Sequence, residues 1–178
     1  MGQPKQLLPI RGKPLIRHMA ESAVAAPVSP VVVVLGAEAE KVRETLAGLP
    51  VKIAVNSEWS AGLSSSLRVG VETALTHASG VSALIICLAD QPNLTQEHLQ
   101  RLIARFGEGG CTAVASLAGE TTMPPILFDR SWFAKLGALQ GDVGARALLR
   151  ERMDEVATVP IDSAEDLDTP EDYAKYVG

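Results

Sequence analysis

The sequence has no long hydrophobic run, only two cysteines and no block of basic residues. Its apolar run from Pro30 to Leu35 is far shorter than the roughly 20 residues that a membrane span needs. Cys87 and Cys111 are too few for a disulfide framework or a cysteine metal cluster. A net charge of −5 without a basic block argues against binding to nucleic acid or to an anionic membrane. No signal peptide follows Met1, so we expect a soluble, cytoplasmic protein.

Several catalytic patterns are also missing. No Gly-x-Gly-x-x-Gly or Walker-type loop occurs, which disfavours nicotinamide and P-loop chemistry. No Ser-His-Asp pattern or nucleophile elbow occurs, which argues against a hydrolase of that kind. The histidines His18, His77 and His98 stand singly in predicted helices, and we expect them at the surface. Aromatic residues are few, at 4% of the chain, and we expect them in the core.

The residues that are present suffice for one folded domain. The chain has 178 residues, of which 47% are hydrophobic and 21% charged, as in a globular protein rather than a disordered one. We therefore treat residues 1–178 as a single domain.

Apolar residues alternate between helical spacing and short buried runs. The predicted strands are 30–35, 51–55, 82–88, 111–117, 125–128 and 156–161. The predicted helices are 15–26, 38–47, 64–77, 99–106 with Thr95 as its cap, 142–151 and a last one that opens at Asp168. This alternation predicts βαβ units and an α/β fold with a doubly wound, mostly parallel sheet. Such a sheet normally begins with a strand and a phosphate-binding turn, and none precedes the first helix, so we expect the domain to be incomplete at its N-terminus.

Asp90 is the strongest candidate for a functional side chain. It follows the fully apolar run 84–88, and ligands of open α/β sheets bind outside the carboxyl ends of the strands. A carboxylate there is well placed to hold Mg²⁺, which prefers oxygen ligands and phosphate co-ligands. The alternative is that Asp90 only ends the strand and begins a turn with Pro92.

Gly62-Leu-Ser-Ser-Ser is the second candidate, because it lies between a predicted strand and a predicted helix. Free backbone amides at a helix N-terminus and three hydroxyls could bind an anion or a ribose. The alternative is a redundant N-cap, since serine is favoured at that position.

Three further residues each have a structural alternative. Lys5 precedes the first helix and could neutralise a phosphate, or it could be a solvated surface lysine. Asp142, between two glycines and a helix start, could contact a substrate or cap that helix. Asp168 follows a strand closely enough to share a metal with Asp90, although its position also suits a helix cap.

Five segments, taken together and in order, resemble the MobA-like nucleotidyltransferases, and most closely the molybdenum-cofactor cytidylyltransferase (MocA-like) branch. The segments begin at Met1 (MGQPKQLLP), Asn56 (NSEWSAGLSSSL), Leu88 (LADQP), Gly141 (GDVGAR) and Leu167 (LDTPED). The first resembles the end of the family signature L-A-A-G-x-S-x-R-M-G-x-P-K-x-L-L, whose first half is absent from this sequence. That half carries the central strand, the glycine turn around the triphosphate and an arginine.

The resemblance implies a Rossmann-like three-layer sandwich of the nucleotide-diphospho-sugar transferase type, and it implies roles for nine residues. Lys5 and Asp90 would be catalytic. The residues implied beside the nucleotide are Lys5, Asn56, Gly62 and Ser64. The residues implied to face the acceptor are Ser65, Gln91 and Asp142, and those implied to hold the metal are Asp90 and Asp168.

The reaction implied by the resemblance is Mg²⁺-dependent transfer of a nucleotidyl group from an NTP, with CTP favoured, to the phosphate of molybdopterin. A molybdenum hydroxylase is the partner that this implies. Two alternatives stay open: an NAD(P)H-dependent reductase of the same family, and a non-catalytic protein that binds molybdenum cofactor for a partner enzyme.

Overall fold

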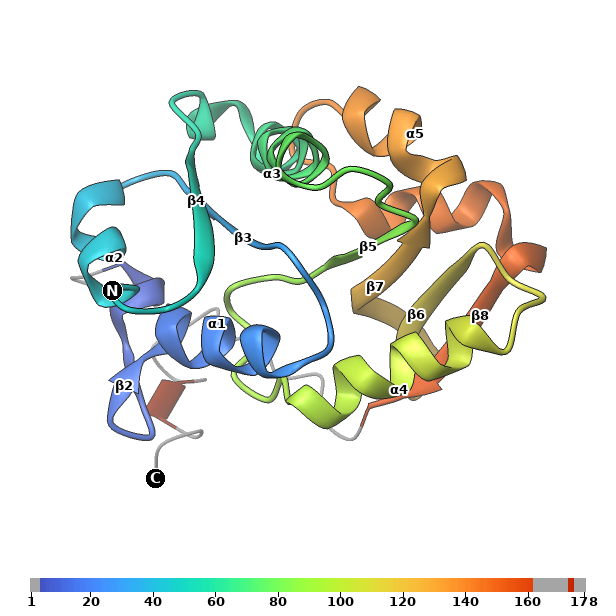
Figure 1. The fold of residues 1–178 in the computed structure, drawn as a ribbon, viewed down its shortest axis with the longest axis horizontal. Helices are drawn as coiled ribbons and strands as arrows, with labels where there is room; N and C mark the ends of the chain where they lie inside the picture. Colours follow the sequence, from blue (N-terminus) through green and yellow to red (C-terminus); the bar gives the residue numbers. More distant parts are fainter. Residues whose placement is uncertain (1–3, 162–172, 175–178) are drawn as a thin grey trace.

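The computed structural model describes residues 4–161 and 173–174, which form a layered α/β fold (Figure 1). The N-terminal elements are η1 Lys5–Leu7, β1 Pro9–Ile10, β2 Lys13–Pro14, α1 Leu15–Ala25, β3 Val31–Leu35, α2 Ala39–Thr45 and β4 Val51–Val55. The middle elements are η2 Trp59–Ala61, α3 Leu63–His77, β5 Ala83–Ile86, α4 Gln96–Gly107, β6 Ala113–Ala118 and β7 Thr121–Asp129. The last described elements are η3 Arg130–Trp132, α5 Phe133–Ala138, η4 Ala145–Glu151, η5 Met153–Glu155 and β8 Val156–Pro160.

The strands form two main groups. β3 and β4 pair in parallel, whereas β5, β7, β6 and β8 form a four-stranded sheet in that order. Within the larger sheet β6 and β8 are parallel, and β7 runs antiparallel to both β5 and β6. The predicted α/β class is confirmed. In the four-stranded sheet, β7 runs in the opposite direction to β5, β6 and β8. A short hairpin of β1 and β2, which the sequence analysis did not predict, turns through Arg11 and Gly12, both at positive φ.

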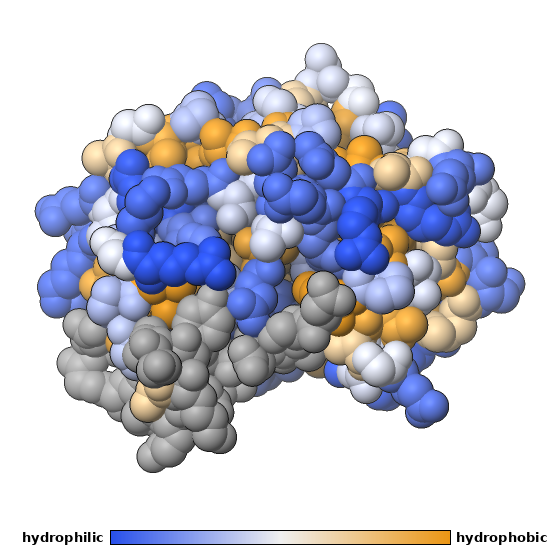
Figure 2. Space-filling model, turned by 90° about the horizontal axis from the view of Figure 1, so that it is seen from below, coloured by the Kyte–Doolittle hydropathy of each residue, from blue (hydrophilic) through white to orange (hydrophobic). Residues whose placement is uncertain are grey.

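Helices cover the strands from two sides (Figure 1). On one side α1 and α4 pack on β6 and β7 through Met19, Leu99, Val114 and Leu127. On the other side α3 and α5 pack on the same sheet through a second cluster that includes Val71. The face formed by α1 and α4 is hydrophilic over much of its surface, with smaller hydrophobic areas between (Figure 2).

β3 and β5 each have one edge without a strand partner among residues 4–161 and 173–174. The same helices cover both strands: α1 contacts β3 and shares a cluster with Ala83 and Ile85, while α3 contacts β3 and packs toward Leu84 and Ile86. All four residues of β5 are only partly buried. The two strand groups therefore lie between common helical layers without pairing to each other.

Most predicted elements are confirmed, with two differences besides the hairpin of β1 and β2. The predicted helix 142–151 is a 3-10 helix that begins at Ala145, and α5 was not predicted. The predicted surface position of His98 is wrong. Its backbone amide donates to the capping Thr95 hydroxyl, and its imidazole is buried against Ser116 Oγ at 2.7 Å. The helix predicted to open at Asp168 lies outside the described residues.

Across the described part of the chain, the helices are too short or too polar to span a bilayer.

Candidate functional site

Three predicted site residues follow the carboxyl ends of two strands. Asn56 comes directly after β4, and its backbone amide donates to the carbonyl of Leu35 at the end of β3. Asp90 and Gln91 come shortly after β5, which follows β4 through α3. These positions match the edge of an α/β sheet at which ligands bind.

Asp90 lies at this edge beside a well-packed apolar cluster. Ala89 packs against the cluster that contains Leu35, and Leu7 of η1 packs against the same cluster. The fold thereby brings the segment that carries Lys5 into the same region as Asp90. Both side chains are partly buried.

Gln91 is more deeply placed than a surface glutamine. Its side chain is 7% exposed, and its Oε1 atom is buried without a hydrogen-bond partner within the described residues. A buried amide oxygen without a donor is costly, by about 1–3 kcal/mol, so such atoms commonly belong to ligand sites.

The donor set at this edge fits a hard divalent cation held jointly with phosphates. Mg²⁺ is usually bound through one or two carboxylates together with substrate phosphates and waters. Asp90 supplies a carboxylate and Gln91 an amide oxygen, whereas no group of three or more metal-ligating side chains exists within residues 4–161 and 173–174. Asp168, the second predicted metal ligand, lies outside the described residues.

Asn56 fixes the loop that leads from β4 to α3. Its Oδ1 accepts from the Glu58 amide at 2.9 Å, and its Nδ2 donates to the hydroxyls of Ser65 and Ser66 at 2.7 and 3.0 Å. The side chain is 3% exposed. Asn56 thus holds the loop and the first turn of α3 in one arrangement.

The N-terminus of α3 is joined to the loop around Gly141. A β-carbon at Gly62, where φ is +101°, would lie 2.6 Å from the carbonyl carbon and oxygen of Gly141. Ser64 donates to that carbonyl through its amide at 3.2 Å and its hydroxyl at 2.7 Å. The amide of Leu63 donates to Asp142 Oδ1 at 3.3 Å. Residues 79 positions apart are therefore held together at this helix end.

The backbone amides and hydroxyls that were predicted to bind an anion already form hydrogen bonds within the protein. The amides of Leu63, Ser64 and Ser65 all donate within the protein, and a carboxylate already lies at the helix end. The Ser65 hydroxyl has the carbonyls of Gly62 and Glu58 as acceptors. Asp142 interacts with α3 rather than capping the helix that follows it, where Gly144 is the capping residue.

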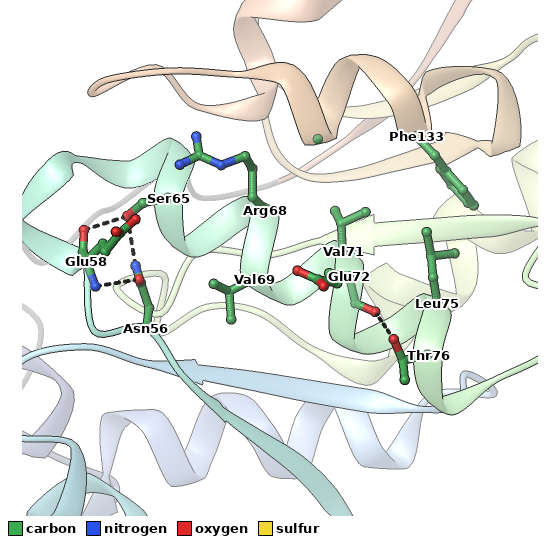
Figure 3. Close-up of a pocket in the computed structure, with 11 residues that line it drawn as sticks. Asn56, Glu58, Ser65, Arg68, Val69, Val71, Glu72, Leu75, Thr76 and Phe133 are labelled. Atoms are coloured by element: carbon green, nitrogen blue, oxygen red, sulfur yellow. Dashed lines mark hydrogen bonds between the residues drawn. The ribbon is translucent and has the colours of Figure 1, made fainter.

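A cavity of about 530 Å³ runs along α3 (Figure 3). Asn56, Glu58 and Ser65 lie at one end of it, and Leu75 and Phe133 lie at the other. Its lining includes two predicted site residues, Asn56 and Ser65, and both polar and apolar side chains of α3, but it does not include Asp90.

Trp59 is an exposed residue near this edge that the sequence pattern did not single out. Aromatic residues were expected in the core, and Trp132 is fully buried, but Trp59 is 51% exposed. A β-carbon at Gly36 would lie 2.7 Å from Cβ and 3.1 Å from Cγ of Trp59, so this side chain lies directly on the backbone after β3. No local pattern distinguishes such a tryptophan from a core residue.

A layered α/β domain with polar side chains after the carboxyl ends of β4 and β5 matches the arrangement in which such folds bind ligands. The chain belongs to the MobA-like NTP transferase domain family, whose model matches residues 1–156.

Known relatives are similar along nearly the whole chain. Nicotine blue oxidoreductase of Paenarthrobacter nicotinovorans is 33% identical, with 94% of this chain and 85% of the relative covered. Purine catabolism protein PucB of Bacillus subtilis (strain 168) is also 33% identical, with 97% and 87% covered. A crystal structure of Rv0371C in complex with manganese, from Mycobacterium tuberculosis H37Rv, is 26% identical with a TM-score of 0.81, and the match covers 97% of this chain and 90% of that one.

Proposed function

We propose that the protein transfers a CMP group from CTP to the phosphate of a molybdopterin-type acceptor in a Mg²⁺-dependent reaction that releases pyrophosphate. Membership of the MobA-like NTP transferase family supports the transfer of a nucleotidyl group. The observation that carries the proposal is the position of Asp90 and Gln91 after β5, in the region reached by the segment of Lys5.

The chemistry needs positioning and charge neutralisation more than a covalent nucleophile. A terminal phosphate oxygen of the acceptor attacks the α-phosphorus of CTP in line. The bond between the α-phosphorus and the bridging oxygen breaks, and pyrophosphate leaves with the electron pair. A bound Mg²⁺ would neutralise charge on the phosphate oxygens. Asp90, with Asp168 as a second ligand, would hold the ion, and Lys5 would neutralise phosphate charge.

The remaining predicted residues would position the two substrates. We propose that Asn56, Gly62 and Ser64 lie beside the nucleotide. The residues proposed to face the acceptor are Ser65, Gln91 and Asp142. Because the hydroxyls of Ser64 and Ser65 have acceptors within the protein, these serines would act mainly by fixing the loops.

We further propose that one more strand completes the single domain between β3 and β5. The support is the pair of strand edges without partners in residues 4–161 and 173–174, covered by α1 on one side and α3 on the other. A strand followed by a glycine-rich turn, as in the L-A-A-G-x-S-x-R half of the family signature, would bring backbone amides to the triphosphate.

A reductase is the second candidate, because the chain is 33% identical to nicotine blue oxidoreductase. Such an enzyme would bind NAD(P)H rather than CTP and would release no pyrophosphate.

The proposed function is tested by measuring pyrophosphate release with purified molybdopterin, Mg²⁺ and either CTP or GTP. We expect release with CTP that stops when EDTA is added, and a product that carries both CMP and the pterin. A parallel titration with NADPH provides the contrast. Tight NADPH binding without pyrophosphate release from any nucleotide would favour the reductase over the proposed transferase. A molybdenum hydroxylase would then no longer be expected as the downstream partner.

A further inference from the structure

We propose that the exposed face of Trp59 stacks on the base of the bound nucleotide and so determines much of the affinity for CTP. This inference rests on the proposed function, since it assigns a base-binding residue to the same site.

The first support is the exposure of the ring. Trp59 is 51% exposed although tryptophan normally buries most of its large apolar surface. The other tryptophan, Trp132, is 0% exposed. Three of the six exposed large hydrophobic side chains in the described residues are Val55, Trp59 and Leu63, all within one nine-residue segment. A large apolar ring left exposed near the ligand-binding edge of an α/β sheet is available to contact a ligand.

The second support is that the ring has a fixed backing. Its Cβ and Cγ lie where a side chain at Gly36 would have to be, so only glycine allows this contact. The loop that carries the ring is held by Asn56, which accepts from the amide of Glu58 and donates to two serines of α3. A ring backed by backbone on a fixed loop loses little conformational freedom when a ligand stacks on it.

The third support is the position of the ring relative to the phosphate-binding residues. Gly36 directly follows Leu35, and Leu35 belongs to the cluster against which both Leu7 and Ala89 pack. Trp59 therefore borders the end of β3, whose last residues pack near the segments of Lys5 and Asp90. A nucleotide with its phosphates at Lys5 and Asp90 has its planar base as the part suited to an aromatic face.

The experiment measures CTP affinity by calorimetry for the wild type and the Trp59→Ala, Trp59→Phe and Met153→Ala variants. Met153 is 53% exposed and lies in η5, so it controls for loss of an exposed apolar side chain elsewhere. We expect Trp59→Ala to weaken CTP binding on the order of 10-fold or more, Trp59→Phe to retain most of the affinity, and Met153→Ala to have no effect.

Inorganic tripolyphosphate separates the base from the phosphates. It should bind the wild type and Trp59→Ala equally, because it has no base to stack. Fluorescence gives a second readout: CTP should quench the emission of the wild type but not that of Trp59→Phe, which retains only Trp132.

Unchanged CTP affinity in Trp59→Ala would overturn the inference, as would a parallel loss of CTP and tripolyphosphate binding. Loss of affinity for a free pterin such as neopterin, with CTP binding intact, would also overturn it. A wild type that binds neither CTP nor tripolyphosphate would instead contradict the proposed function itself.

Discussion

The backbone of Gly62 packs directly on that of Gly141, so the N-terminus of α3 and a loop 79 residues away form one unit. This contact places Ser64 and Asp142 next to each other, because Ser64 binds the Gly141 carbonyl while Asp142 accepts from Leu63. A glycine is required at position 62 for two reasons: its φ is +101°, and a β-carbon would lie 2.6 Å from Gly141.

The Gly62→Ala substitution should therefore lower the free energy of unfolding by about 1–3 kcal/mol and weaken substrate binding. Gly80→Ala is the matched control, because Gly80 also has a positive φ of +76° but has no atom within 4 Å of the added carbon. Urea unfolding of the two variants compares Gly62→Ala with a positive-φ glycine that makes no such contact, and the larger loss is expected for Gly62→Ala. Equal destabilisation of both would show that the Gly141 contact contributes nothing.

Acid should lower the free energy of unfolding, because Glu155 becomes protonated. The Arg152 guanidinium, hydrogen-bonded to this carboxyl, holds the pKa of Glu155 below its usual value of 4.5, with a further contribution from the Thr112 hydroxyl. A carboxyl whose pKa is lowered in the folded state contributes stability above its unfolded pKa, and that contribution is lost as pH falls through the folded pKa.

Glu155→Gln should consequently be less stable than the wild type at pH 7, and the difference should narrow below pH 4.5. Urea midpoints at pH 7 and at acidic pH measure this. Glu120→Gln, in the exposed turn between β6 and β7, is the control and should show no such convergence. A constant difference between wild type and Glu155→Gln at all pH values would refute the assignment.

The edges of β3 and β5 should accept an added strand. A short apolar, β-branched peptide would pair with both edges and cover the partly buried side chains of β5. We expect it to raise the thermal unfolding midpoint in a concentration-dependent way, as a ligand of the folded state does. The same peptide with a central proline lacks one backbone N–H and cannot pair continuously as a central strand, so it should have no effect. Equal responses to both peptides would argue against a strand site.

Local pattern predicted the elements whose apolar spacing is regular. α1, β3, β4 and α4 lie close to their predicted positions, and the Thr95 cap of α4 is confirmed. α5 was missed because it has only six residues, too few for a periodic signal. The alternation of strands and helices does not reveal that β7 runs antiparallel to its neighbours.

The site was predictable only in part. The edge position of Asp90 followed from the strand that precedes it, as the α/β binding rule states. The helix cap that was one of two predicted roles for Asp142 is not formed, since Asp142 accepts from the Leu63 amide of α3, and no local pattern reveals a contact over 79 positions. Trp59 was missed for a different reason: its position against the backbone depends on Gly36, which follows another strand, and local sequence does not reveal that contact.

Asp90 is the residue on which the proposed metal-dependent nucleotidyl transfer depends most. The most direct measurement is Mg²⁺-dependent pyrophosphate release from CTP and molybdopterin by Asp90→Asn, alongside Asp154→Asn as an exposed control in η5. We expect a loss of at least about 100-fold for Asp90→Asn with an unchanged melting temperature, and full activity in the control. Pyrophosphate release by Asp90→Asn at the wild-type rate would contradict the account.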